Sequence, residues 1–152
     1  MLVSGKEFRR IDLIVIHHTA SNEKTHTWEE IRQWHLNKGW RDIGYHYGVV
    51  FDDGEWKVKA GRDETTIGAH AKGFNMNSIG IAVEGNYETD DLPEEAFTLL
   101  RALCANICAR MNLNAKKVIK GHRELPYPTA CPGKNMPLDR LRDAVAGTVI
   151  AG

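Results

Sequence analysis

Two histidines and one cysteine are the residues of this chain best suited to chemistry. His17 ends an apolar run that begins at Leu13, and His122 and Cys131 lie close together near the other end of the sequence. Imidazole nitrogens and thiolates are preferred ligands of Zn²⁺, and three protein ligands leave a fourth position open, as in hydrolytic zinc sites. The three residues therefore predict one catalytic zinc ion per chain.

His18 competes with His17 for a place in this site. The two residues are neighbours on a predicted strand, where successive side chains point to opposite faces, so only one of them can join His122 and Cys131. Periodicity does not decide between them. A single histidine on a buried strand is more often a hydrogen-bonded core residue than a metal ligand. Because His122 and Cys131 offer two further ligands, we expect either His17 or His18 to be a ligand and the other to be a core residue.

Further motifs surround these residues in a fixed order. They are Ile14–Ala20, Ile31–His35, Gly39–Tyr47, Ala60–Glu64, His70–Asn75, Asn77–Ile81, Gly121–His122 and Ala130–Pro132. In this order they resemble the T7-lysozyme-type N-acetylmuramoyl-L-alanine amidases, a family whose fold is shared by peptidoglycan recognition proteins. The resemblance extends from about Ile11 to about Leu141, which is nearly the whole chain.

The resemblance assigns roles to individual residues. It implies that His17 is the strand ligand, together with His122 and Cys131, and that His18 is structural. Tyr45, in a Gly-Tyr-His motif, matches a family tyrosine that lies beside the metal. A phenol there can hydrogen-bond the oxyanion that forms during acyl transfer, so we expect Tyr45 to be catalytic.

Thr129 is a departure from the pattern of the phage enzymes. These amidases usually carry a lysine two residues before the cysteine, whereas amidase-active peptidoglycan recognition proteins carry threonine there, as this chain does. A hydroxyl donates one hydrogen bond to an oxyanion but brings no positive charge. We therefore expect the same class of reaction, with Thr129 as a second catalytic residue of smaller weight.

Polar and aromatic loop residues are the candidates for substrate binding. Loops on a rigid scaffold often carry binding groups, although a single charged loop residue is usually only solvated. His70 is the first candidate, and Asn75 belongs to the same polar set. Arg62 could equally be structural, and Trp40 could equally form core. We expect these four residues to line a substrate-binding groove beside the zinc site.

Composition limits the classes of protein that the chain can belong to. Its 152 residues predict a single domain spanning residues 1–152. With 20 basic and 20 acidic residues, no net charge draws it to nucleic acid or to an anionic membrane. The N-terminus has no apolar secretory signal and no stretch approaches transmembrane length. We therefore expect a monomer that is made in the cytoplasm and does not insert into membranes.

The other two cysteines differ from Cys131. Cys104 and Cys108 share a helical face with apolar residues, and small buried core residues are a better interpretation than metal binding or a disulfide. Cys131 lies instead in a proline-rich polar loop, where packing gives no reason for a cysteine. This contrast singles out Cys131 as the chemical one.

The spacing of apolar residues predicts the elements that position the site. We expect strands at 11–18, 45–51, 55–59, 78–84 and 118–120, and helices at 28–38, at 93–112 and from 138. This order predicts an α/β domain with helices packed on a mixed sheet. The resemblance implies a central mixed sheet of about five strands, flanked by about three α-helices, with the zinc site in a surface groove.

The resemblance also implies an activity, which is hydrolysis of the amide between the N-acetylmuramoyl lactyl group and L-alanine in peptidoglycan. With no signal peptide, the chain is expected to be a phage or prophage endolysin that acts on the cell wall after release. The alternatives are a cytoplasmic muropeptide-recycling amidase, a non-catalytic peptidoglycan-binding module and a regulatory partner of a polymerase. A pure binder needs no open zinc site, so the intact set of His17, His122, Cys131 and Tyr45 favours an enzyme.

Overall fold

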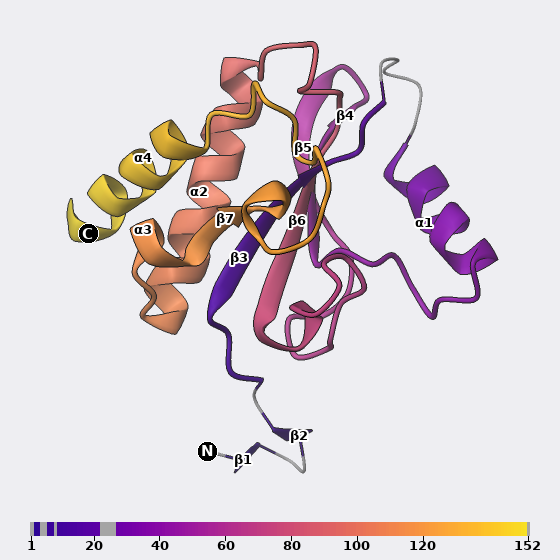
Figure 1. The fold of residues 1–152 in the computed structure, drawn as a ribbon, viewed down its shortest axis with the longest axis horizontal. Helices are drawn as coiled ribbons and strands as arrows, with labels where there is room; N and C mark the ends of the chain where they lie inside the picture. The colour runs from indigo at the N-terminus through magenta and orange to yellow at the C-terminus, as the bar shows by residue number, and fades with distance from the viewer. Residues whose placement is uncertain (1, 4–5, 8, 22–26, 152) are drawn as a thin grey trace.

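The computed structural model describes residues 2–3, 6–7, 9–21 and 27–151. A mixed sheet of five strands lies at its centre, in the order β5-β4-β6-β3-β7 (Figure 1). All neighbours in it are parallel except β4 and β5, and its strands are β3 (Leu13–His18), β4 (Tyr47–Asp52), β5 (Glu55–Ala60), β6 (Ser78–Val83) and β7 (Ile119–Gly121). The predicted α/β class and central mixed sheet are confirmed. The two-residue strands β1 (Leu2–Val3) and β2 (Lys6–Glu7) pair with each other outside this sheet.

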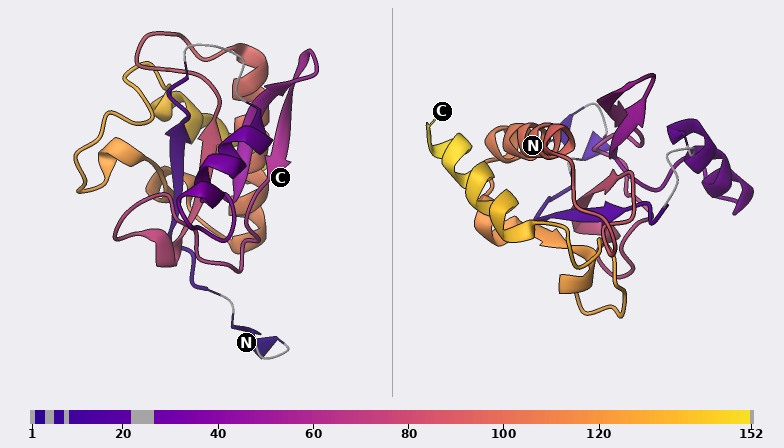
Figure 2. Two further views of the ribbon diagram at one scale, coloured as in Figure 1. Left: turned by 90° about the vertical axis from the view of Figure 1, so that its right-hand side faces the viewer. Right: turned by 90° about the horizontal axis from the view of Figure 1, so that it is seen from above.

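Helices cover the sheet from both sides. Three lie on one side, namely α2 (Glu94–Met111), α3 (Ala115–Val118) and α4 (Leu138–Ala151), and α1 (Trp28–Asn37) lies on the other (Figures 1 and 2). The three longer helices confirm the sequence prediction. The one-turn α3 was not predicted, and the strand expected from Val118 begins instead at Ile119. None of the described helices combines the length and apolar character needed to span a bilayer.

The main core lies between the sheet and α2. Ile14 and Ile16 of β3 are fully buried there, together with apolar residues of β6 and α2: Ile79, Ile81, Leu100, Cys104, Ile107 and Cys108. Each large aliphatic side chain buried in this way contributes roughly 1.5–3 kcal/mol, so this face fixes the position of β3. Cys104 and Cys108 are free thiols within the core, as the apolar interpretation predicted.

On the opposite face of the sheet, loops cover β3. Because side chains alternate along a strand, Val15 and His17 point away from the face that carries Ile14 and Ile16. Val15 packs in a second, smaller cluster with Ala71 and Leu125, which come from the loops before β6 and after β7. His17 therefore points toward the loops of the predicted site.

Short local motifs account for the start of α1 and for the turn between β4 and β5. Thr27 and Glu30 make a capping box at the start of α1, with the backbone N–H of Glu30 donating to the Thr27 hydroxyl at 3.1 Å. Asp53 and Gly54 connect β4 to β5, and both have positive φ angles, of 51° and 81°. Aspartate and glycine tolerate this left-handed backbone, which two-residue hairpin turns require.

Candidate metal centre

Parallel pairing of β3 with β7 brings the two predicted histidine ligands together. Ile16 is paired with Gly121 in this register, so the residues that follow them, His17 and His122, lie side by side at the same edge of the sheet. Their ring centroids are 4.6 Å apart. His18 points elsewhere, and its Nδ1 accepts a hydrogen bond from the backbone N–H of Tyr87 at 3.1 Å. The geometry thus groups His17, and not His18, with His122 and Cys131.

Cys131 completes the cluster from the loop that follows η2 (His122–Glu124). The backbone N–H of Arg123 donates to the carbonyl of Cys131 at 2.7 Å, which fixes the returning loop beside the first residues after β7. The Cys131 thiol then accepts from the backbone N–H of His18 at 3.4 Å. Among the described residues, ligand atoms of His17, His122 and Cys131 lie within 4.8 Å of one another.

The dimensions and donor set of this cluster fit zinc. Zn–N and Zn–S bonds of about 2.1 and 2.3 Å at a tetrahedral angle separate the two ligand atoms by about 3.6 Å, and Nδ1 of His17 lies 3.6 Å from Sγ of Cys131. Within the described part of the chain, Nε2 of His122 is buried without a hydrogen-bond partner. Such an atom costs free energy, and a metal-binding histidine accounts for it.

The electrostatics of the cluster also suit a cation. Burial lowers the pKa of His17 well below its usual value, and the neighbouring His70 and His122 lower it further. Burial also lowers the pKa of His122, so both rings are neutral and able to bind a metal at pH 7. Burial raises the pKa of the Cys131 thiol to about 11, against the opposing effects of the His18 N–H and the Arg123 charge. A divalent cation beside this thiol favours the thiolate.

Tyr45, the predicted catalytic tyrosine, lies next to His17. Their ring centroids are 5.2 Å apart, and the Tyr45 ring is also flanked by His35 and Trp28 of α1, at 5.6 and 6.4 Å. Burial raises the pKa of Tyr45 and the adjacent Cys131 raises it further. The phenol therefore keeps its proton and remains a hydrogen-bond donor at this position.

Thr129 lies two residues before Cys131 and bonds its backbone. Its hydroxyl oxygen accepts the backbone N–H of Cys131 at 3.2 Å, a local bond that threonine commonly makes with the backbone two residues ahead. The hydroxyl proton is not used in this bond. Thr129 is thus held next to Cys131 with a donor to spare.

A groove leads away from the cluster and contains three of the four predicted substrate-binding residues. Trp40, His70 and Asn75 line a cavity of about 370 Å³ together with His122 and Tyr127. Trp40 packs on the ring of His35 with centroids 4.6 Å apart. The structure therefore brings a candidate metal ligand and an aromatic wall into one open space.

Arg62 and Asn75 make hydrogen bonds to the backbone of these loops. The guanidinium of Arg62 donates to the carbonyls of Ile43 and Ile67, both at 2.8 Å, and to that of Asp42 at 3.3 Å. The side-chain oxygen of Asn75 accepts the backbone N–H groups of His70 and Ala71 at 2.9 and 2.8 Å. Arg62 does not line the groove cavity, whereas Asn75 does; their part in substrate binding stays a prediction.

Two residues near the site were missed by the sequence reasoning. The Tyr127 ring is stacked on His122, with centroids 5.5 Å apart and an interplanar angle of 6°, and it is 41% exposed to solvent. Arg123 fixes the Cys131 loop, as described above. Both belong to the short segment between His122 and Cys131. This closeness in sequence to two predicted ligands could have marked them as residues of the site.

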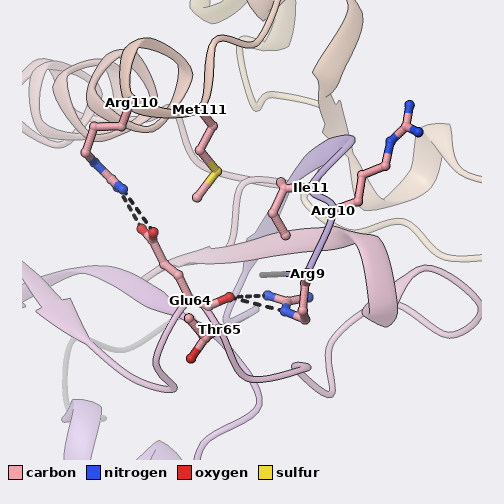
Figure 3. A pocket seen from close by; sticks show the side chains of 7 residues that line it. All are labelled: Arg9, Arg10, Ile11, Glu64, Thr65, Arg110 and Met111. Atoms are coloured by element: carbon pink, nitrogen blue, oxygen red, sulfur yellow. Dashed lines mark hydrogen bonds and ion pairs between the residues drawn. The ribbon is translucent and has the colours of Figure 1, made fainter. Parts of the chain in front are cut away.

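A larger cavity of about 430 Å³ lies at the opposite end of β3, where Arg9 and Ile11 precede the strand (Figure 3). Its basic side chains are already bonded. Arg110 donates to both carboxylate oxygens of Glu64, at 3.0 and 2.8 Å, and Arg9 donates to the Glu64 backbone carbonyl at 2.7 Å. This cavity offers no cluster comparable to the two imidazoles and the thiol.

The fold and the site together define a class of protein. Two imidazoles and a thiol at the edge of a mixed sheet, with a protonated tyrosine beside them and a groove leading away, are typical of metal-dependent hydrolases. The comparison with known families makes this specific. Residues 7–134 match the family described as N-acetylmuramoyl-L-alanine amidase, and the chain belongs to this family.

Individual relatives agree with this assignment. The chain is 37% identical to the endolysin of Escherichia phage T7 over 136 residues, covering 86% of this chain and 85% of the phage protein. It is 34% identical to the peptidoglycan-recognition protein SC2 of Drosophila melanogaster, covering 80% and 68%. Among solved structures, the N-acetylmuramoyl-L-alanine amidase LysC from Clostridium intestinale superposes with a TM-score of 0.77 at 31% identity, covering 90% and 85%.

Proposed function

We propose that this protein is a zinc-dependent N-acetylmuramoyl-L-alanine amidase. Its substrate is peptidoglycan, and the bond cut is the amide that joins the lactyl group of N-acetylmuramic acid to the first L-alanine of the stem peptide. The observation that carries the proposal is the cluster of His17, His122 and Cys131, which lies beside Tyr45 and next to the groove in a chain of the amidase family.

His17, His122 and Cys131 would hold the zinc ion. Two neutral imidazoles and one thiolate would leave the centre with a net single positive charge, and the ion would supply Lewis-acid activation of a carbonyl and of water. The 3.6 Å between Nδ1 of His17 and Sγ of Cys131 and the mixed nitrogen and sulfur donors support zinc over Mg²⁺ and Ca²⁺, which prefer oxygen ligands.

The side chains around the cluster orient the substrate and stabilise charge. Tyr45 donates its phenolic proton in a hydrogen bond to the oxyanion that forms from the lactyl carbonyl. Thr129, held by the backbone N–H of Cys131, supplies a second and neutral donor. The groove lined by Trp40, His70, Asn75 and Tyr127 receives the adjoining sugar and peptide, and exposed aromatic rings suit the apolar faces of sugars.

The proposed biological setting is that of a phage or prophage endolysin. The relative from phage T7 bears that name and is matched over most of its length. In this setting the enzyme is made in the cytoplasm as a monomer of one domain, does not insert into membranes and reaches the wall after release. Sedimentation of the purified protein tests the monomer, and loss of turbidity of membrane-permeabilised cells tests the lytic role.

The bond that is cut can be identified from the products of digestion. Zinc-loaded protein incubated with purified peptidoglycan should release new N-terminal L-alanine, because the amide nitrogen that becomes free belongs to that residue. New reducing sugar ends should stay at background, because hydrolysis of the amide leaves the glycosidic bonds of the glycan intact. Labelling of free amino groups and a reducing-end assay measure the two products separately.

Each alternative outcome of the digestion has a definite meaning. New reducing ends without new alanine termini would make the protein a glycosidase. Neither product from protein that binds peptidoglycan and carries zinc would favour a recognition module without activity. Cys131→Ser protein serves as the matched control in both assays, because contaminating hydrolases would act equally in the two samples.

Thr129 is tested by a pair of substitutions. Thr129→Val keeps the shape but removes the hydroxyl, and we expect turnover to fall by about tenfold, the order of one lost hydrogen bond. Thr129→Ser keeps the hydroxyl and should stay near wild type, and zinc content should not change in either variant. If Thr129→Val retains full activity, the hydroxyl has no catalytic part.

A further inference from the structure

His70 contacts a candidate metal ligand directly. Nδ1 of His17 faces the Cys131 thiol, and the other ring nitrogen of His17, Nε2, lies 2.9 Å from Nδ1 of His70. The two rings are nearly perpendicular, at 88°, so the nitrogen at the edge of one ring points to that of the other. His70 thus contacts the side of His17 that faces away from Cys131.

The contact continues to a buried serine. Nε2 of His70 lies 3.0 Å from the hydroxyl oxygen of Ser78, and Ser78 is fully buried at the start of β6. The three side chains therefore form one hydrogen-bonded row that runs from the candidate metal centre into the sheet.

The row has one consistent assignment of protons. If Nδ1 of His17 is the metal-binding atom, its lone pair is used and the ring proton sits on Nε2. That proton can only be donated, so Nδ1 of His70 must accept it, and the proton of His70 lies on its own Nε2. This N–H then donates to the Ser78 oxygen. Every nitrogen in the row has a single role, and all donors point away from the metal centre.

Neighbouring glycines leave space for the His70 ring. A side-chain carbon at Gly80 would come within 2.5 Å of the His70 ring, and one at Gly68 within 2.7 Å. Neither glycine is among those with a positive φ angle. At Gly80 the nearest atoms all belong to the His70 ring, whereas Gly68 also lies against the carbonyl of Gly44 and the ring of His46. Asn75 accepts the backbone N–H of His70, so both the backbone and one side of the ring are fixed while the ring still borders the groove.

We propose that His70 is a positioning residue for the zinc ligand His17. It accepts the Nε2 proton of His17 and so keeps the Nδ1 lone pair directed at the metal, and Ser78 in turn orients His70. This inference rests on the proposed zinc amidase function. His70 is a neutral acceptor. A carboxylate in the same place would reduce the net positive charge of the metal centre, whereas His70 leaves that charge unchanged.

Zinc affinity is the direct test. Loss of a partner that orients a metal-bound histidine typically weakens metal binding or activity by about 10–100-fold, so His70→Ala should weaken zinc binding by that factor in a chelator competition assay. His70→Asn places an amide oxygen near the position of Nδ1 and should recover most of the affinity. Ser78→Ala removes only the far end of the row and should have a smaller effect in the same direction.

A second readout separates positioning from a general loss of structure. In Co²⁺-substituted protein the absorption bands report the ligand geometry, and we expect them to shift in His70→Ala and to return toward wild type in His70→Asn. His18→Asn is the matched control. His18 is another buried imidazole, which accepts the backbone N–H of Tyr87, and its ring belongs neither to the ligand cluster nor to the row, so zinc affinity and the cobalt spectrum should stay close to wild type.

The outcomes distinguish this inference from the proposed function. Wild-type protein that binds no zinc would overturn the proposed function itself. Wild-type protein that binds zinc and cuts peptidoglycan, with His70→Ala equal to it in zinc affinity and cobalt spectrum, would overturn the role of His70 alone. The same would follow if His18→Asn lost as much zinc affinity as His70→Ala. If His70→Ala does not fold, His70→Gln takes its place, because the longer side chain carries its amide near the position of Nε2 and leaves the proton of His17 without an acceptor. Zinc affinity in His70→Gln equal to that in wild type would then overturn the role of His70.

Discussion

Cys131→Ser is expected to yield folded protein that no longer retains zinc and no longer cuts peptidoglycan. A serine hydroxyl does not ionise near neutral pH and cannot replace the thiolate that neutralises much of the metal charge. His122→Ala removes a second ligand and should give the same result. Activity should fall by more than about 10³-fold in either variant, since the Lewis acid alone is worth several kcal/mol of transition-state stabilisation. Elemental analysis and the alanine-release assay measure the two losses.

The chain offers matched controls for these ligand variants. His18 is adjacent to His17 but points to the other face, where it bonds the backbone of Tyr87, so His18→Asn should keep its zinc. Cys108 is a free thiol on the buried face of α2, and Cys108→Ala should also keep zinc even if it unfolds at a lower temperature. Full zinc retention by protein that carries both Cys131→Ser and His122→Ala would disprove the ligand set.

The part of the site that the sequence could predict depends on short-range pattern. A buried aliphatic run predicts β3 from local sequence alone, and two histidines end this run. The Gly121–His122 pair follows a second short strand, and parallel pairing then places the ends of both strands at one edge of the sheet. The resemblance to a family selected His17 over His18, which local periodicity could not do.

The part that could not be predicted depends on how loops fold back over the sheet. The contact of His70 with His17 joins residues 53 positions apart, and no periodicity links a loop residue to the far side of a ligand. The bonding of Arg62 could not be predicted either, because nothing in its motif indicates that its guanidinium donates to the carbonyls of Ile43 and Ile67. Backbone hydrogen bonds of this kind become visible only in the folded chain.

Helix α3 was missed for a related reason. Its four residues, Ala115–Val118, are too few to show a helical period, and their apolar ends also fit the start of a strand. The helix forms because Asn114 caps it, with the side-chain oxygen accepting the backbone N–H of Lys116, and because Ala115 and Val118 are buried. The sequence alone gave no means of weighing this burial against strand pairing.

Tyr45→Phe is expected to lower turnover by about 10²–10³-fold, the usual effect of losing one donor to an oxyanion. The substitution keeps the ring, which packs beside His17 and against Trp28 and His35 of α1. Zinc content and binding of peptidoglycan should therefore stay close to wild type, while the rate of alanine release falls. Because burial keeps the pKa of Tyr45 raised, the loss should be the same across the neutral pH range.

Tyr47→Phe is the matched control for this prediction. Tyr47 lies two residues further along, and its hydroxyl donates to the carboxylate of Glu64 rather than toward the metal centre. Removing that hydroxyl should change stability but leave turnover close to wild type. Equal turnover in Tyr45→Phe and Tyr47→Phe would reduce Tyr45 to a packing residue. The stabilisation of the oxyanion would then have to come from the metal together with Thr129, and Thr129→Val would become the substitution with the larger effect.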